Sequence, residues 1–133
     1  MNAEVVVVGG GLAGSAAAIR LARAGRDVVV IERSPHAQHK VCGEFLSREA
    51  LNYLELLGLQ ATSFGAVPIG AVRLACKGQR SEAKLPFQAL SLTRRRLDEE
   101  LLRLAVEAGA RVLRGCQVRA LERDGTRWRA VLE

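Results

Sequence analysis

The chain has 133 residues, 49% of them apolar and 4% aromatic, which fits one α/β domain with a core of Val, Leu and Ala. No apolar segment approaches the ~18 residues that span a bilayer, and no signal peptide is evident, so we expect a cytoplasmic protein. The net charge is +6, but the basic residues are dispersed and not interleaved with aromatic ones, which argues against a nucleic-acid partner.

The three cysteines, Cys42, Cys76 and Cys116, form no CxxC pair, and reduced thiols are therefore expected. His36, His39 and Cys42 have a spacing that could suit a metal ion. They lie in a predicted loop without an evident fourth ligand, so we predict no metal site.

The segment from Val5 to Glu32 has the pattern of a dinucleotide-binding βαβ unit. It begins with the β-branched run Val5–Val8, which predicts a strand buried on both faces of a parallel sheet. A glycine-rich turn follows, and the small and apolar residues from about Leu12 to Ala24 predict a helix that ends at Gly25. Val28 to Ile31 form the second predicted strand.

Three glycines in this turn have separate predicted functions. Gly9 permits the sharp turn out of the strand, and Gly14 allows the helix to pack closely on the strand. Gly11 lets the backbone approach a pyrophosphate that a Cβ atom would keep away. The N–H groups of the first helical turn, among them those of Leu12 and Ala13, point at the same phosphates together with the positive end of the helix dipole.

Glu32 stands at the end of the second predicted strand, eighteen residues after Gly14. This is close to the spacing of the carboxylate that binds the adenosine ribose in dinucleotide-binding proteins. A carboxylate at this position would also repel a 2′-phosphate, so NADP is not expected here. The segment therefore predicts a site for a dinucleotide such as NAD or FAD.

The rest of the chain combines predicted helices with antiparallel hairpins, which a plain NAD-type doubly wound domain lacks. Apolar residues at helical spacing predict the helices, and period-two alternation predicts the hairpins. The predicted elements are a helix from Ser47 to before Gly58, a hairpin of 72–76 and 83–87, a helix from about Thr93 to Gly109, a strand at 111–113, and a hairpin of 116–122 and 126–132 closed by a type I′ turn at Asp124-Gly125. We expect residues 65–90 to be a hairpin insertion directed toward a separate substrate domain.

Three segments resemble one group of flavoproteins: Val5–Glu32, the KVCGEFLS segment Lys40–Ser47, and Leu92–Val118. They are similar to the amino-terminal part of FAD-dependent oxidoreductases of the para-hydroxybenzoate-hydroxylase-like superfamily, which includes geranylgeranyl reductases, flavin-dependent halogenases and aromatic-ring monooxygenases. The cysteine-glycine pair before a helix most resembles the geranylgeranyl reductase branch. The resemblance implies a Rossmann-like FAD/NAD(P)-binding domain over residues 1–133, a parallel sheet with inserted antiparallel hairpins, and FAD bound in extended form.

The resemblance also implies further cofactor contacts. Arg33 would lie near the adenine, and the backbone of Val118 would meet it. Arg94 matches the arginine of the family's arginine-x-x-hydrophobic-aspartate pattern, which typically reaches the phosphate or ribityl region. Independently, three arginines at the start of the predicted helix oppose its dipole, and a pyrophosphate near Arg94 would offset this. The two arginines that follow are interpreted as surface residues.

Cys42 has two interpretations that the sequence leaves open. The Cys42-Gly43 pair could pack beside the flavin ring, or Cys42 could be a small apolar residue that fills the joint between loop and helix. Glu44 could face the same cavity or lie near the helix dipole. We assign Cys42 no redox role and name no catalytic residue, because flavin chemistry belongs to the cofactor.

Complete members of the superfamily are longer and carry a second flavin motif and a sheet that covers the flavin. We therefore expect this chain to be the amino-terminal FAD-binding portion of an oxidoreductase that takes electrons from NAD(P)H or another donor and reduces a small or isoprenoid substrate. Alone it would bind FAD weakly and be inactive, and its exposed sheet edges would favour self-association. The alternatives are a fragment of a flavin monooxygenase or halogenase, and a non-enzymatic NAD- or FAD-binding module.

Overall fold

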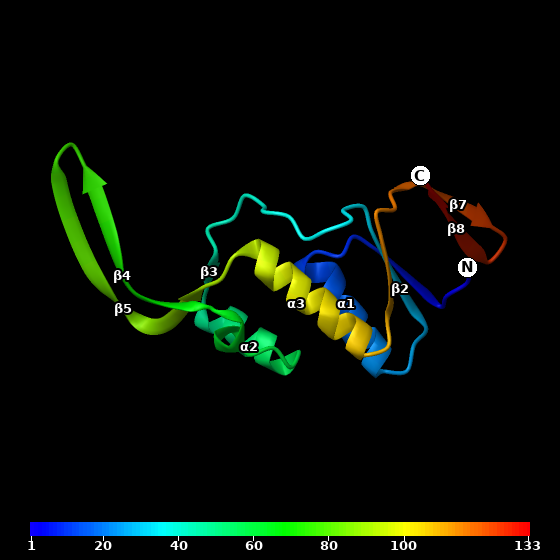
Figure 1. The fold of residues 1–133 in the computed structure, drawn as a ribbon, viewed down its shortest axis with the longest axis horizontal. Helices are drawn as coiled ribbons and strands as arrows, with labels where there is room; N and C mark the ends of the chain where they lie inside the picture. Colours follow the sequence, from blue (N-terminus) through cyan, green and yellow to red (C-terminus); the bar gives the residue numbers. More distant parts are fainter. The chain divides into compact units, whose positions relative to one another are not determined.

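The structure, a computed structural model, describes all residues from 1 to 133 and consists of two compact units. The first unit comprises Met1–His39 and Arg95–Glu133, and the second comprises Lys40–Arg94. Each unit has its own β-structure: the first holds a parallel sheet and a terminal hairpin, and the second holds a long hairpin (Figure 1). None of the helices is long and apolar enough to cross a membrane.

The parallel sheet of the first unit contains β1 (Val5–Val8), β2 (Val28–Glu32) and β6 (Arg111–Arg114). The strand order is β1-β2-β6, and both neighbouring pairs run parallel. Parallel neighbours need long crossover connections, and a helix precedes both β2 and β6 along the chain. The predicted α/β class with a parallel sheet and inserted hairpins is confirmed.

The helices of this unit are α1 (Leu12–Arg23) and, except for its first residue, α3 (Arg94–Glu107), close to their predicted bounds. Ala18 and Ile19 of α1 are fully buried, and the small alanine side chain allows the helix to lie close to the sheet. The buried apolar residues of α3 recur at helical spacing: Leu97, Leu101, Leu102 and Ala105. Apolar periodicity in the sequence therefore identified the buried side of both helices.

The position of β1 corrects one expectation from the sequence. β1 lies at an edge of the sheet with β2 on one side only, and its Val6 and Val8 are 44% and 55% exposed. The strand buried on both faces is β2, whose residues Val28 to Ile31 are all buried. A run of β-branched residues suits both positions, because composition does not reveal how many neighbours a strand has. Self-association through the β1 edge stays a prediction.

The first unit ends in a two-stranded hairpin of β7 (Val118–Asp124) and β8 (Arg127–Leu132). The predicted type I′ turn at Asp124-Gly125 is wrong, because Asp124 still pairs with Arg127 as a strand residue. The two linking residues are therefore Gly125 and Thr126, of which only Gly125 has a positive φ (61°). A type I′ turn requires a positive φ at both central positions.

The second unit holds five elements: β3 (Phe45–Leu46), α2 (Arg48–Leu56), the 3₁₀ helix η1 (Ala61–Phe64), β4 (Val67–Cys76) and β5 (Gln79–Ser91). Its sheet has the order β3-β5-β4 and is antiparallel. The helix begins as predicted, because the Ala50 N–H donates to Oγ of Ser47 at 3.3 Å. The hairpin of β4 and β5 is longer than its predicted strands, and Lys77 and Gly78 at its tip both have positive φ (44° and 81°), which matches a type I′ turn.

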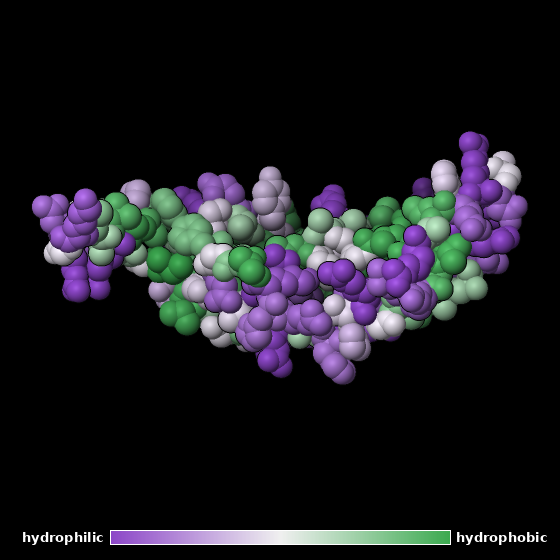
Figure 2. All heavy atoms as spheres, turned by 90° about the horizontal axis from the view of Figure 1, so that it is seen from above, coloured by the Kyte–Doolittle hydropathy of each residue, from purple (hydrophilic) through white to green (hydrophobic).

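The two faces of this hairpin differ in polarity. Val72 pairs with Ala83, and Leu74 pairs with Ser81, so these side chains share one face. Arg73 and Glu82, one residue along, pair on the other face with an ion pair at 2.7 Å. Leu74 is 70% exposed although apolar. Figure 2 shows apolar side chains along the hairpin behind a hydrophilic tip.

Candidate nucleotide-binding site

The turn between β1 and α1 has the conformation that its glycines predict. Gly9 has a φ of 98°, and its N–H donates to the Ile31 carbonyl at 2.8 Å, which ties the turn to β2. A Cβ atom on Gly14 would lie 1.9 Å from the Gly9 carbonyl oxygen and 3.2 Å from Cγ1 of Val7. The predicted sharp turn at Gly9 and close packing at Gly14 are confirmed. Their contact with a pyrophosphate stays a prediction.

The start of α1 offers backbone N–H groups at this turn. Gly11 is the N-cap residue, and no side chain caps the helix. The first turn, which includes Leu12 and Ala13, also contains no acidic residue. The N–H groups of a first helical turn lack partners within the helix and, with the positive end of the dipole, favour an anion. This geometry suits the predicted role of Gly11, Leu12 and Ala13 without demonstrating it.

Two residues of the turn were not singled out from the sequence. A Cβ atom on Gly10 would lie 2.9 Å from Cδ2 of Leu102 on α3, so a larger residue at this position would require the Leu102 side chain to shift. The hydroxyl of Ser15, which is fully buried, donates to the Gly10 carbonyl at 3.0 Å. The three consecutive glycines are a sequence signal that could have identified Gly10. No neighbouring residue in the sequence predicts the hydrogen bond of Ser15 to the Gly10 carbonyl.

Glu32 lies at the carboxyl end of β2, the edge at which open α/β sheets bind ligands. Its Oε2 accepts a hydrogen bond from the Gly10 N–H at 2.7 Å, and its Oε1 accepts one from the Ser34 N–H at 2.8 Å. The structure therefore brings Glu32 and the glycine turn together, as the dinucleotide pattern requires. Its ribose contact stays a prediction.

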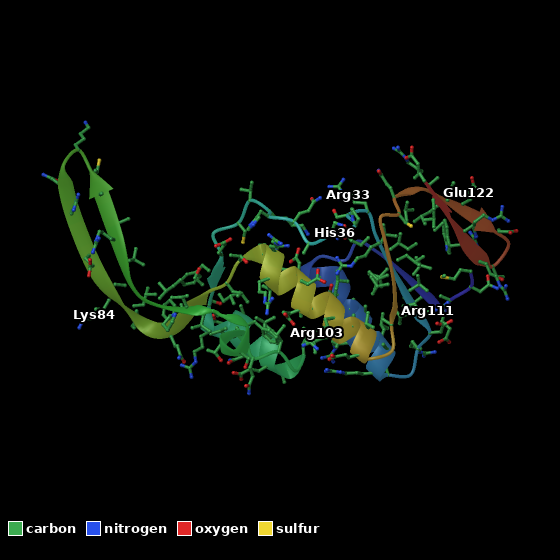
Figure 3. All side chains as sticks on the ribbon, in the orientation of Figure 1. Arg33, His36, Lys84, Arg103, Arg111 and Glu122 are labelled. Carbon is green, nitrogen blue, oxygen red and sulfur yellow. The ribbon has the colours of Figure 1, made fainter.

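Arg33 and Val118 are the residues predicted near the adenine. Arg33 is the neighbour of Glu32 in the chain, and the segment just before Val118 is hydrogen-bonded to Glu32. Arg33 follows Glu32 directly, is exposed, and stands at the end of β2 near His36 (Figure 3). The Cys116 N–H donates to the Glu32 carbonyl at 3.2 Å, two residues before Val118 begins β7. Arg33 therefore lies at the carboxyl edge of this sheet, and Val118 begins the separate β7-β8 hairpin two residues after the bond to Glu32. Both adenine contacts stay predictions.

Cys42 and Arg94 belong to the second unit, whereas all the other predicted site residues belong to the first. Cys42 is exposed, and its Sγ accepts a hydrogen bond from the Glu44 N–H at 3.4 Å. Glu44 has a positive φ of 52°, which is uncommon for a residue other than glycine. Arg94 is half-buried at the start of α3. The proposed cofactor contacts of Cys42 and Arg94 stay predictions.

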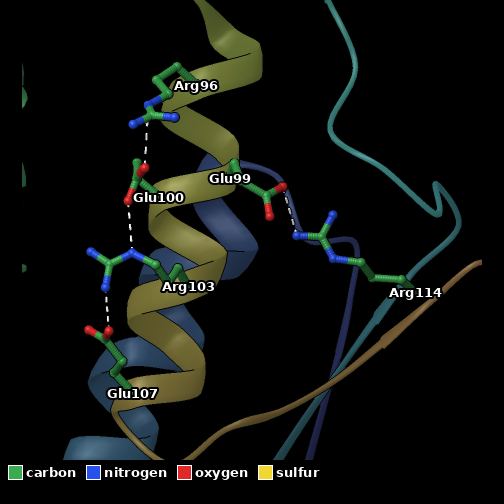
Figure 4. Close-up of polar contacts among 6 residues, drawn as sticks. All are labelled: Arg96, Glu99, Glu100, Arg103, Glu107 and Arg114. Carbon is green, nitrogen blue, oxygen red and sulfur yellow. Dashed lines mark hydrogen bonds and ion pairs between the residues drawn. The ribbon is translucent and has the colours of Figure 1, made fainter. Parts of the chain in front are cut away.

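Ion pairs account for part of the charge on α3 (Figure 4). Arg96 lies 3.3 Å from the buried carboxylate of Glu100, which also binds Arg103 at 2.8 Å, and Arg103 in turn pairs with Glu107. The hydrogen bond from Arg103 to Glu100 is the main cause of the raised pKa of Arg103. The structure thus gives Arg96 the surface role that we inferred for it, with Glu100 as its counter-charge.

A second ion pair joins α3 to the carboxyl edge of the sheet. Arg114, the last residue of β6, pairs in register with Glu32 and donates to Glu99 of α3 at 2.9 Å (Figure 4). No group of three or more His, Cys, Asp or Glu side chains is arranged to hold a metal ion. The edge therefore combines backbone donors, one carboxylate and nearby arginines, a donor set suited to a nucleotide.

The family described as FAD binding domain matches residues 2–133. The chain belongs to this family. FAD is thus the cofactor of the domain, and the flavoprotein class predicted from the resemblance is confirmed.

Characterised relatives match the chain over a part of their length. The menaquinone reductase of Mycobacterium tuberculosis is 36% identical over 131 residues, which cover 95% of this chain and 32% of the reductase. A flavin-dependent halogenase of Metacordyceps chlamydosporia is 32% identical over 124 residues, which cover 91% of this chain and 24% of the halogenase. The chain thus spans about a third of the length of the menaquinone reductase.

Solved structures show the same fold. A geranylgeranyl bacteriochlorophyll reductase-like protein from Thermoplasma acidophilum superimposes with a TM-score of 0.80 at 28% identity, over 98% of this chain and 34% of its own. A flavin-dependent monooxygenase in complex with FAD and substrate has a TM-score of 0.83 at 19% identity, over 99% of this chain and 27% of its own. The predicted Rossmann-like FAD-binding fold is confirmed, and a geranylgeranyl reductase-like protein is among its structural neighbours.

Proposed function

We propose that the chain is the FAD-binding portion of a flavin-dependent oxidoreductase that reduces an apolar isoprenoid or quinone-like substrate. The observation that carries this proposal is the glycine turn closed by Glu32 at the carboxyl edge of a parallel sheet, within a chain that matches the family from residue 2 to 133. The similarity to menaquinone reductases and to a geranylgeranyl reductase-like structure favours reduction over oxygenation. A bound flavin would supply hydride and electron transfer.

Different residues of the first unit would bind the pyrophosphate, the ribose and the adenine of the cofactor's ADP half. Gly9, Gly11 and Gly14, with the N–H groups of Leu12 and Ala13, would hold the pyrophosphate. The remaining contacts would be made by Glu32 on the ribose and by Arg33 and Val118 at the adenine. The support for these roles is that the glycine turn and Glu32 are hydrogen-bonded at the carboxyl edge of the sheet, and that Arg33 and Cys116 adjoin Glu32.

Two residues of the second unit would act on the flavin side of the cofactor. Arg94 would neutralise a phosphate or reach the ribityl chain, and the Cys42-Gly43 pair would pack beside the flavin ring. Exposure of Cys42 supports its availability for such packing. Arg94→Met should then weaken FAD more than ADP, whereas a purely structural arginine would change both equally.

Titration of the purified chain with FAD, ADP and NAD tests the cofactor assignment. We expect ADP and FAD to bind, with the ADP half supplying most of the affinity and Arg94 adding a smaller gain for FAD. Binding of NAD without binding of FAD would contradict the flavoprotein assignment and favour a nicotinamide-sensing module.

We propose that the hairpin at residues 65–90 contacts the substrate-binding part of the complete oxidoreductase. The support is its uncovered apolar face with Val72 and Leu74, together with the 32% of the menaquinone reductase that the chain matches. By itself the chain would not catalyse a reaction. NAD(P)H is the electron donor that we propose for the complete enzyme.

A chimaera tests the reaction and the hairpin together. In it, this chain replaces the matched segment of the M. tuberculosis menaquinone reductase, and NAD(P)H-dependent quinone reduction is measured. We expect activity in the chimaera, loss of activity with Leu74→Lys, and little change with the control Arg73→Gln on the opposite face. A chimaera that binds FAD and oxidises NAD(P)H without reducing quinone would contradict the reductase assignment. The alternative is then a monooxygenase or halogenase, to which the similarity to the halogenase of Metacordyceps chlamydosporia points.

A further inference from the structure

One carboxylate, that of Glu32, accepts hydrogen bonds from two backbone segments. Oε2 accepts from Gly10 at 2.7 Å, and Oε1 accepts from Ser34 at 2.8 Å. Gly10 lies in the turn after β1, whereas Ser34 lies just beyond β2. Hydrogen bonds to an ionised acceptor are about twice as strong as neutral ones, so this pair of bonds links the turn firmly to the end of the strand.

The Gly10 residue is held from three directions. Its N–H points to Glu32, its carbonyl accepts from the Ser15 hydroxyl at 3.0 Å, and a Cβ atom built on it would lie 2.9 Å from Cδ2 of Leu102. A peptide held in this way cannot rotate to present its N–H to a ligand. A diphosphate at this turn must therefore use the N–H groups that follow Gly10.

We propose that Glu32 is a positioning residue for the phosphate-binding turn, in addition to any contact with the ribose. Its carboxylate sets the orientation of the Gly10 peptide before a nucleotide binds, and with it the direction of the N–H groups at the start of α1. The inference rests on the proposed function in that the turn is taken to hold a diphosphate.

Amide hydrogen exchange in the nucleotide-free chain tests the positioning itself. Glu32→Ala keeps the Cβ atom but removes both acceptors, and we expect exchange of the Gly10 and Ser34 amides to accelerate at least about tenfold. Glu32→Gln keeps the side-chain size but has a single acceptor oxygen, and should release one of the two amides. Unchanged exchange of Gly10 and Ser34 in both variants would overturn the proposal.

The matched control is Glu4→Ala. The carboxylate of Glu4 accepts a hydrogen bond from the Asp27 N–H at 2.9 Å. Asp27 directly precedes β2, so this bond lies at the opposite end of the strand from Glu32 and the carboxyl edge of the sheet. This variant should accelerate exchange of Asp27 and leave that of Gly10 unchanged. Acceleration of the Gly10 amide by Glu4→Ala would mean that any lost carboxylate loosens the sheet, and would overturn a specific role of Glu32.

Two nucleotides separate the positioning role from a ribose contact. ADP carries the 2′- and 3′-hydroxyls, and 2′,3′-dideoxy-ADP lacks both. A residue that touched only these hydroxyls would not affect the dideoxy compound, whereas we expect Glu32→Ala to weaken both nucleotides, the dideoxy one by about tenfold. Unchanged affinity for dideoxy-ADP would overturn the proposal. If the unsubstituted chain bound neither nucleotide, the proposed function would fail, and the exchange of Gly10 would still decide the positioning role.

Discussion

Gly14 of helix α1 lies directly against the carbonyl oxygen of Gly9, and a Cβ atom at position 14 would come within 1.9 Å of it. Backbone atoms cannot move aside as the end of a side chain can, so α1 would have to shift away from β1. We expect Gly14→Ala to lower the free energy of unfolding by roughly 1–3 kcal/mol and to weaken ADP binding. Urea unfolding and ADP titration measure these effects.

Gly70→Ala is the control for this substitution. No atom lies within 4 Å of a Cβ built on Gly70, and its backbone conformation is open to other residues. It should change neither ADP affinity nor, beyond a few tenths of a kcal/mol, stability. Equal stability losses in the two variants would contradict the packing role of Gly14.

Local conformational demands explain why the first unit could be predicted from its sequence. The positive φ of Gly9 and the crowding at Gly14 are imposed by the turn itself, so the spacing of these glycines reports on it directly. The same holds for Ser47, because its hydroxyl oxygen accepts a hydrogen bond from the N–H of Ala50, only three residues further along the chain. Glu32 could be found because its distance from the glycines in sequence reflects the length of one helix and one strand.

Relations between residues far apart in the chain could not be predicted in this way. The crowding at Gly10 comes from Leu102 of α3, and the partial exposure of Val6 comes from the sheet face to which it points, which is less covered than the face of Val5 and Val7. The turn after Asp124 was misplaced because strand pairing extended further than the alternation indicated.

The contact between Gly10 and Leu102 predicts non-additive substitutions. Gly10→Ala should destabilise the chain by about 1–3 kcal/mol because the new methyl meets the leucine side chain. Leu102→Ala should cost about 2–5 kcal/mol because the leucine is buried. In the double variant the methyl has room, so the total loss should be smaller than the sum by at least about 0.5 kcal/mol. Additive losses by urea unfolding would contradict the contact.

Discrimination against a 2′-phosphate is expected from the charge of Glu32. At a partly exposed site, one like-charge contact costs enough to separate ADP from 2′-phospho-ADP by about tenfold. Glu32→Ala should reduce this ratio even though both affinities fall. Calorimetric titration of the two nucleotides measures the ratio, and a preference for 2′-phospho-ADP in the unsubstituted chain would refute the assignment.

Capping of α2 predicts a pH-dependent contribution to stability. Ser47→Ala removes the acceptor for the Ala50 N–H and should cost about 1 kcal/mol. The pKa of Glu49 is lowered from its ordinary 4.5, mainly by its own backbone N–H and then by Ser47. A lowered pKa means that the folded state favours the ionised form, so this stability is present above pH 4.5 and disappears as the pH falls through the lowered value.

The comparison that isolates the Glu49 effect is thermal unfolding of the original chain and of Ser47→Ala between pH 7 and pH 3. The difference between the two melting temperatures should shrink as Glu49 becomes protonated, because one of its stabilising partners is Ser47. A difference that stays constant over this range would show that the Ser47 hydroxyl acts on the backbone alone.

The ion pairs on α3 predict that substituting a paired arginine lowers the melting temperature more than substituting an unpaired, exposed one. Arg103 pairs with the buried Glu100 and with Glu107, whereas Arg95 is exposed and takes no part in these ion pairs. Arg103→Met should therefore lower the melting temperature more than Arg95→Met, because it leaves the buried Glu100 with Arg96 alone. Since Arg103 is itself largely solvent-accessible, the difference should be small and should decrease in 1 M salt, where the Debye length is about 3 Å. A salt-independent difference would indicate that the aliphatic part of Arg103, rather than its charge, stabilises the helix.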